Sequence, residues 1–327
     1  MSKLTNNIFK VALSLVLGGA ILYWMYRDFD FEQVRQVVLH EMNWTWMLLS
    51  FPFGIMAQAF RGLRWRQTLS PIGEHARRDV AVNAVFLSYA ASLIIPRIGE
   101  FARCGVLRRW EGTSFPKALG TVVTERAIDS VLVLVVTALT FIFQFRFFDI
   151  FFQKTGTRLD TIFSAFSLTG WLVTGVCGVA VLILLVWLFR RMSVYNKMRD
   201  TFRGLWEGVL SVKNVANVPL FLFYTLAIWV CYFLHYYLTF FCFASTSHLG
   251  IGCALVTFVV GSIAVIVPTP NGAGPWHFAV KTMLMLFGVA QQDALYFVLI
   301  VHFVQTLLVA VLGIYAWLRL SFTRKSV

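Results

Sequence analysis

Long apolar runs alternate with short polar segments along most of the chain. Runs long enough to cross a bilayer, about 17 to 25 residues each, fall near residues 8–26, 43–60, 116–145, 162–189, 218–243 and 294–318. They predict six transmembrane helices. The first run continues to Met25 without a small-x-small cleavage site before Arg27, so we expect a retained helix and not a cleaved signal peptide.

Two further apolar stretches are too short to cross the bilayer once. They cover residues 80–95 and 253–267, each ends at a proline, Pro96 or Pro268, and each is followed by a glycine-marked polar turn. Broken helices at membrane depth often mark transport sites. We therefore expect two re-entrant helical hairpins, the second covering 253–289.

Composition agrees with a membrane protein. Hydrophobic residues make up 59% of the chain and charged residues 13%, with a mean hydropathy of +0.75, whereas charged residues are about a quarter of a soluble domain. The net charge of +13 arises from basic clusters beside the spans and not from one recognition helix. We therefore expect no nucleic-acid partner, and the positive-inside rule places these clusters, and both chain ends, in the cytoplasm.

Charge also gives the two short stretches opposite orientations. The basic segments 61–78 and 97–117 both belong in the cytoplasm, so the stretch between them must enter and leave by that side. The span at 218–243 leaves the cytoplasm and the span at 294–318 returns to it, so the second hairpin between them must begin and end on the outside. Span, hairpin and span therefore occur at 43–145 and again, inverted, at 218–318, which predicts an inverted repeat. Eight simple crossings are the alternative.

The predicted fold is thus an all-α integral membrane protein with six transmembrane helices and two oppositely oriented re-entrant hairpins. We expect residues 1–327 to form a single polytopic membrane domain. The one long hydrophilic stretch, 190–217, has apolar residues at helical spacing opposite its basic residues. It predicts a helix on the cytoplasmic leaflet, with partner docking as the alternative.

The first break carries positive charge. A helix that starts inside the membrane presents unpaired N–H groups and a partial charge of about +0.5 at its first turn, which attracts anions. After Pro96 we expect a helix to begin near Gly99, with Arg97 and Arg103 adding two permanent charges. These residues predict an anion site.

The second break repeats this arrangement with different residues. After Gly272 and Gly274, Pro275 suits the first turn of a new helix. His277 and Lys281 are four residues apart and share one helical face. We expect a second backbone-lined positive pocket here, facing the first.

Charged residues within the apolar stretches cost about 2.5 to 3.5 kcal/mol each to insert and need partners. Glu125 and Asp129 share a helical face, and Arg126 can pair with Asp129. In a functional interpretation, Glu100 and Glu125 hold nearby arginines until a phosphate competes for the guanidinium groups. The alternative is a permanent structural ion-pair cluster.

Cysteine and histidine spacing predicts no metal site. The five cysteines form no Cys-x-x-Cys pair and are expected to be small core residues: Cys104, Cys177, Cys231, Cys242 and Cys253. His235 and His302 stand alone on apolar helices and are expected to be hydrogen-bonded between helices. Without a Walker-type loop, we expect no cofactor.

Three motifs carry a resemblance to a known family: Pro96-x-x-Gly99-Glu100-x-x-Arg103, Glu125-Arg126-x-x-Asp129 and the Pro-x-Pro-x-Gly-x-Gly turn at 268–274. Over nearly the whole chain the sequence resembles the flippase-like transmembrane region of lysylphosphatidylglycerol synthases. The resemblance implies movement of lipids between leaflets, two re-entrant hairpins, and a bacterial or archaeal cytoplasmic membrane. Many relatives have Gly-Gly-x-Gly followed by an acidic residue where this chain has Asn271-Gly272-Ala273-Gly274 and then His277, so the headgroup preference does not carry over.

We expect a stand-alone member without the aminoacyl-transferase domain, and not an enzyme. The expected function is a lipid translocase for an anionic or aminoacylated phospholipid or a polyprenyl-phosphate lipid. Its expected partners are that lipid and a separate lipid-modifying enzyme, and the oligomeric state is left open. A transporter of small soluble anions is the alternative. A lipid-phosphate enzyme with Glu100 or Glu125 as general base is disfavoured, since the chain has no Gly-x-Ser-x-Gly motif and no metal-ligand cluster.

Overall fold

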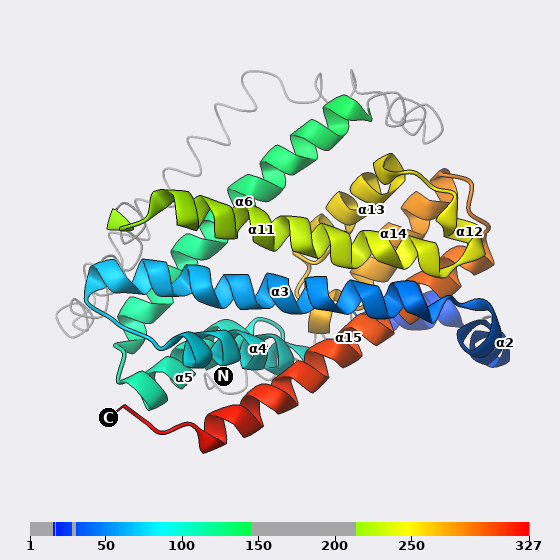
Figure 1. The fold of residues 1–327 in the computed structure, drawn as a ribbon. Coiled ribbons are helices and arrows are strands. Elements are labelled where there is room, and N and C mark those ends of the chain that lie inside the picture. The colour runs from blue at the N-terminus through cyan, green and yellow to red at the C-terminus, as the bar shows by residue number, and fades with distance from the viewer. Residues whose placement is uncertain (1–15, 17, 28–30, 145–213, 327) are drawn as a thin grey trace, which may run out of the picture.

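The computed structural model of the chain describes residues 16, 18–27, 31–144 and 214–326, and every regular element within them is helical (Figure 1). The predicted span at 162–189, Cys177, most of the predicted surface helix at 190–217 and the first part of the span at 8–26 lie outside these residues.

The described helices fall into two groups along the chain. After a helical segment at 18–26, the first group is α2 (Phe31–Gln36), α3 (Trp44–Leu69), α4 (Arg78–Ile94), α5 (Ile98–Glu111) and α6 (Phe115–Phe143). The second group is α11 (Val218–Tyr237), α12 (Ala244–Ser247), α13 (Ile251–Ala264), α14 (Pro275–Leu286) and α15 (Gln291–Phe322). Single turns of tighter or wider helix lie at Val37–Glu41, Ser70–Ile72, Leu238–Cys242 and Pro270–Gly272.

Three described helices are long and apolar enough to cross a membrane: Phe115–Phe143, Val218–Cys242 and Gln291–Phe322. They coincide with three of the predicted spans. The span predicted at 43–60 lies in α3, but this helix does not end there. It continues through Arg61 and Arg64 to Leu69, so assigning these two arginines to a polar segment after the span was wrong.

The two proline-marked breaks each join a pair of short helices. Between α4 and α5, Arg97 adopts a left-handed conformation with φ of 63°, and α5 begins at Ile98, one residue before Gly99. Between α13 and α14, Gly272 and Gly274 have φ of 74° and 90°, values that glycine adopts without steric cost. Helix α14 begins at Pro275, as predicted.

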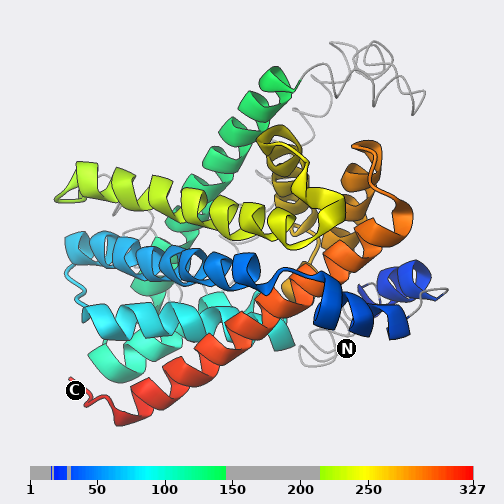
Figure 2. The same ribbon diagram turned by 45° about the vertical axis from the view of Figure 1, so that its right-hand side comes forward.

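The packing of the two groups follows one pattern. In the first group, α3 contacts α4, α4 contacts α5, and α5 contacts α6; in the second group, α11 contacts α13, α13 contacts α14, and α14 contacts α15. Between the groups, α3 lies along α11, α4 packs on α15, and α13 packs on α6 (Figures 1 and 2). Each of these contacts has a counterpart when α3, α4, α5 and α6 are exchanged for α11, α13, α14 and α15, whereas α3 also packs on α6 and this packing is not matched to the same extent by α11 and α15.

Helices approach each other closely at two glycine residues, which have no side chain. A Cβ atom on Gly99 would overlap the Ser88 carbonyl oxygen of α4, and one on Gly313 of α15 would overlap the Ala90 Cβ. Small residues allow such contacts between membrane helices, where burial of apolar surface gives little driving force. The hairpin α4–α5 is thereby held against its neighbours at fixed positions.

The described cysteines and His235 confirm the sequence-based expectations. Cys104, Cys231, Cys242 and Cys253 are buried free thiols. The His235 Nδ1 atom lies 2.8 Å from the Ser50 carbonyl oxygen of α3, so this histidine is hydrogen-bonded between helices.

Candidate functional site

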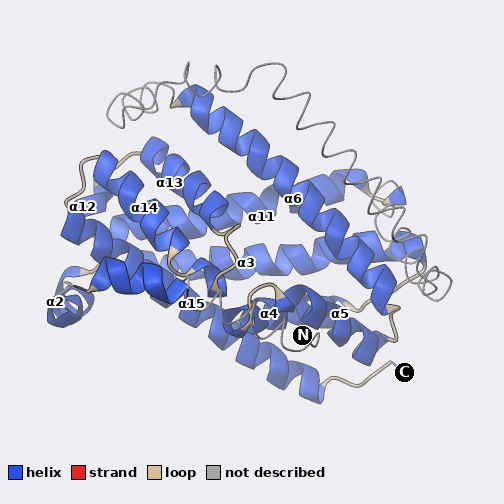
Figure 3. Cartoon of the chain, turned by 180° about the vertical axis from the view of Figure 1, so that it is seen from behind, coloured by secondary structure: helices blue, strands red, loops and turns tan. Residues whose placement is uncertain are grey.

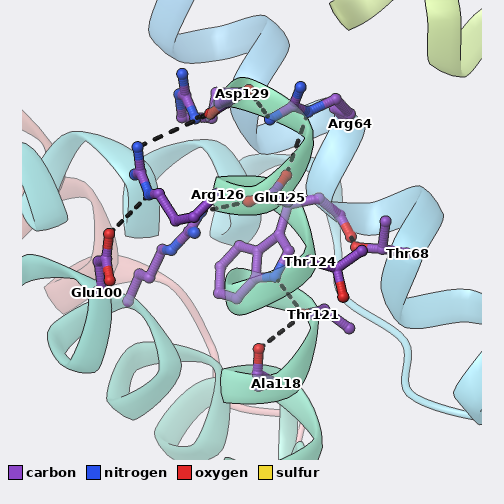
Figure 4. A network of polar contacts seen from close by, with 12 residues as sticks. Arg64, Thr68, Glu100, Ala118, Thr121, Thr124, Glu125, Arg126 and Asp129 are labelled. Carbon is purple, nitrogen blue, oxygen red and sulfur yellow. Dashed lines mark hydrogen bonds and ion pairs between the residues drawn. The ribbon is translucent and has the colours of Figure 1, made fainter. Parts of the chain in front are cut away.

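The centre of the candidate site is an ion-pair network on α6. Figure 3 shows helix α6 within the bundle, and Figure 4 shows that Glu125 and Asp129, one turn apart on this helix, both point toward Arg64 of α3. The Arg64 Nη2 atom lies 2.9 Å from Asp129 Oδ1, and its Nε lies 3.4 Å from Glu125 Oε1. One guanidinium group thus bridges two carboxylates.

A second arginine occupies the other oxygen of Glu125. Arg103 Nη1 of α5 lies 2.9 Å from Glu125 Oε2, and both side chains are buried. The Arg103 guanidinium carbon lies 4.6 Å from the centre of the Trp65 ring, and Trp65 Nε1 donates to Thr121 at 2.8 Å. Stacking on an aromatic ring and pairing with a carboxylate are both suited to the planar guanidinium group.

The network continues from Asp129 to the second group of helices. Arg61 donates to Asp129, and its guanidinium carbon lies 5.9 Å from the centre of the Tyr232 ring on α11. Tyr232 in turn donates to the Tyr89 hydroxyl of α4 at 2.9 Å. The buried charges therefore connect α3 and α6 to α4 and α11.

One edge of the network is accessible. Arg126 Nε lies 2.7 Å from Glu100 Oε1, and these side chains are 40% and 33% exposed. Arg126 Nη1 also lies 3.8 Å from Asp129 Oδ2. The Arg126–Glu100 pair is therefore the most exposed ion pair of the described network.

The two hairpin breaks touch each other. Arg97 Nη2, on the break before α5, donates to the Ile266 carbonyl oxygen on the break before α14 at 2.9 Å. The expected N–H groups at the starts of the two helices are partly engaged, because Gly99 N donates to Ser92 Oγ at 3.2 Å and Gly274 N donates to His277 Nδ1 at 3.4 Å. One N–H group at each break is therefore already engaged within the protein.

The predicted site residues divide into two places. Glu100, Arg103, Glu125, Arg126 and Asp129 come together in the network, with Arg97 and Gly99 at the adjacent break. The other four lie in the second hairpin, where no hydrogen bond or ion pair of the described residues joins them to the network: Gly272, Gly274, His277 and Lys281. His277 is buried with its ring centre 4.4 Å from that of His302, and Lys281 is half-buried.

The family model described as the lysylphosphatidylglycerol synthase TM region matches residues 10–313. The chain belongs to this family. Searches of curated proteins and of solved structures gave no match.

Arg61 and Arg64 were not assigned to the ion-pair network from the sequence. Arg61 and Arg64 were expected in a basic loop, but both are buried within α3. Their spacing contained a usable signal, since residues three apart lie on one helical face and no proline follows Pro52 before Leu69. Thr225, which accepts from Arg64 Nη1 at 3.4 Å, carried no such signal because its partner is on another helix.

Proposed function

We propose that this family member is a lipid translocase of a cytoplasmic membrane, which moves an anionic or aminoacylated phospholipid or a polyprenyl-phosphate lipid between leaflets. The observation that carries the proposal is the charge of the network. Four arginines, Arg61, Arg64, Arg103 and Arg126, face three carboxylates, Glu100, Glu125 and Asp129. The excess positive charge favours an anionic headgroup at membrane depth, where charges are weakly screened.

The headgroup phosphate enters at the Arg126–Glu100 pair. Phosphate competes with the Glu100 carboxylate for the guanidinium fork of Arg126, which can bind phosphate through two parallel hydrogen bonds. The partial exposure of both side chains supports this exchange, because neither has to leave a closed interior. The acyl chains stay in the bilayer during transfer.

The buried part of the network has a different role in this proposal. Arg64, Arg103 and Glu125 are fully buried and already paired, and removing one member of such a pair leaves an uncompensated charge. We assign them to positioning α3, α5 and α6 around Arg126. In this proposal Arg126 and Glu100 therefore have the functional role, and the buried Arg64, Arg103 and Glu125 have the structural role.

Two re-entrant hairpins in an inverted repeat provide the alternating access. Helices α4, α5, α13 and α14 have 17, 14, 14 and 12 residues, shorter than the roughly 20 needed to cross a bilayer. The paired pattern of helix contacts in the two groups supports the repeat. The hydrogen bond from Arg97 to the Ile266 carbonyl joins the two breaks and supports a common position for the two hairpin tips next to the proposed headgroup path.

We propose transport without covalent chemistry. Glu125 is a poor candidate for a general base, because each of its carboxylate oxygens already accepts from an arginine. Glu100 holds Arg126. Both carboxylates are thus engaged by arginines.

Leaflet transfer in vesicles tests the proposal. The purified chain is reconstituted with acyl-labelled phosphatidylglycerol, lysylphosphatidylglycerol or a polyprenyl phosphate, and label reaching the outer leaflet is quenched over time. The wild type should transfer at least one of these lipids faster than empty vesicles, and Arg126→Gln should slow that transfer roughly tenfold, as expected for a lost hydrogen bond between charged groups.

Arg35→Gln is the matched control, because Arg35 forms an exposed pair with Glu32 at 3.6 Å outside the network. It should transfer lipid like the wild type. If none of the three lipids moves faster than in empty vesicles, the translocase proposal is wrong. Uptake of inorganic phosphate by the same vesicles would then favour the small-anion transporter.

A further inference from the structure

A cavity away from the ion-pair network lies beside the second hairpin. It has a volume of about 620 Å³, within the range of roughly 300–1,000 Å³ typical of small-molecule sites. The end of the helix at 18–26, the turn before α14 and the middle of α15 enclose it, through residues that include Leu22, Tyr23, Ala273, His277, Leu299 and Phe303.

The cavity is open to the surroundings of the protein through an apolar rim. Tyr23 and Phe303 line it and are 75% and 65% exposed. Phe303 lies on α15, one of the membrane-length helices, so the bilayer is the natural surrounding of its exposed side. Arg27, at the end of the apolar first run, also lines the cavity and indicates that it reaches the membrane interface.

Both ring nitrogens of His302, one of the two histidines that line the cavity, have hydrogen-bond partners. His302 Nε2 lies 3.1 Å from the Asn271 carbonyl oxygen, which can only accept, so Nε2 carries the proton. Its Nδ1 lies 3.5 Å from Thr306 Oγ1, which itself accepts from Asn271 Nδ2 at 2.7 Å. These bonds fix the His302 ring against the turn.

The neighbouring histidine keeps one donor unused. His277 Nδ1 accepts from Gly274 N–H, so in the neutral ring the proton is on Nε2. Among the described residues no hydrogen bond involves this Nε2, although His277 is only 3% exposed. Because His277 lines the cavity, its Nε2–H is a donor that can reach an acceptor bound there.

We propose that the cavity binds the upper part of one fatty-acyl chain of an ester-linked lipid, with the ester carbonyl accepting from His277 Nε2. An ester carbonyl is a neutral acceptor at the junction of an apolar chain and a polar headgroup. It therefore matches a cavity that combines an apolar wall with the Nε2–H of His277. This site is separate from Arg126, and it does not depend on lipid translocation.

A competition between two lipids tests the contact. The full chain in mild detergent is given equal amounts of diester and diether phosphatidylglycerol with identical chains and headgroups, and native mass spectrometry measures the ratio bound. Only the diester has carbonyl acceptors. The wild type should prefer it roughly 2- to 13-fold, the factor that corresponds to the net ~0.5–1.5 kcal/mol of a neutral hydrogen bond.

Three variants separate this site from the phosphate site. His277→Phe should bring the ratio to about one, and Leu299→Trp, which fills the cavity without altering His277, should also abolish the preference. Arg126→Gln changes only the separate phosphate site and should leave a preference for the diester in place. Equal binding of the two lipids by the wild type overturns the proposal, as does an unchanged preference in Leu299→Trp or in folded His277→Phe.

Discussion

Arg103 and Glu125 form an ion pair of 2.9 Å in which both side chains are buried. They come from different helices, α5 and α6, and Glu125 also receives Arg64 from α3. A carboxylate shared by two guanidinium groups is held at both oxygens. The packing of three helices therefore depends on one buried charge.

Replacing Glu125 by glutamine should destabilise the protein strongly. The neutral amide would leave Arg64 and Arg103 without their shared negative charge, and breaking a buried ion pair typically costs about 3–5 kcal/mol. Thermal unfolding in detergent should show a large fall in Tm. Glu32→Gln is the control, because Glu32 is 84% exposed; it should leave Tm unchanged, and an equally stable Glu125→Gln would contradict a structural role for the network.

Replacing Glu100 by glutamine should strengthen lipid binding. Glu100 is the competitor that phosphate has to displace from Arg126, so its neutral analogue should lower the apparent Kd for phosphatidylglycerol by about 2- to 5-fold, as expected for a partly exposed ion pair worth up to ~1 kcal/mol. Native mass spectrometry of lipid titrations measures this change.

Glu111→Gln provides the charge-matched control for that variant. Glu111 lies on the same helix, α5, and pairs with Arg77 at 2.8 Å. Its replacement changes the net charge equally and should leave the Kd unchanged. A similar gain of affinity in both variants would mean that general electrostatic attraction, and not competition at Arg126, governs lipid binding.

The periodicity of the chain predicted the membrane class, the breaks at Pro96 and Pro268 and the charged faces of α6, because each is encoded within one segment. Partners from other segments were not predictable in this way. Arg64 reaches Glu125 only because α3 continues past the apolar run and packs on α6. Asn271 likewise reaches His302 and Thr306 of α15 from a segment with which they share no sequence pattern.

Gly99→Ala should destabilise the first hairpin. The added Cβ would overlap the Ser88 carbonyl oxygen, and overpacking of this kind costs typically about 1–3 kcal/mol. Gly105→Ala, also in α5, adds its Cβ to open space and should be neutral or stabilising by up to ~1 kcal/mol through helix propensity. Unfolding temperatures of the two variants should therefore move in different directions, and a common shift would contradict the close contact of α4 and α5.

Arg97 combines backbone strain with the contact between the hairpin tips, and two substitutions separate these effects. Arg97→Ala loses the hydrogen bond to Ile266 but keeps a side chain at φ of 63°, whereas Arg97→Gly loses the same bond and removes the steric cost, about 1–2 kcal/mol for a left-handed residue. The glycine variant should therefore unfold at the higher temperature. Both variants should slow leaflet transfer to the same extent, because both lose the contact between the two breaks. Transfer at the wild-type rate by Arg97→Gly would show that the tip contact serves only stability.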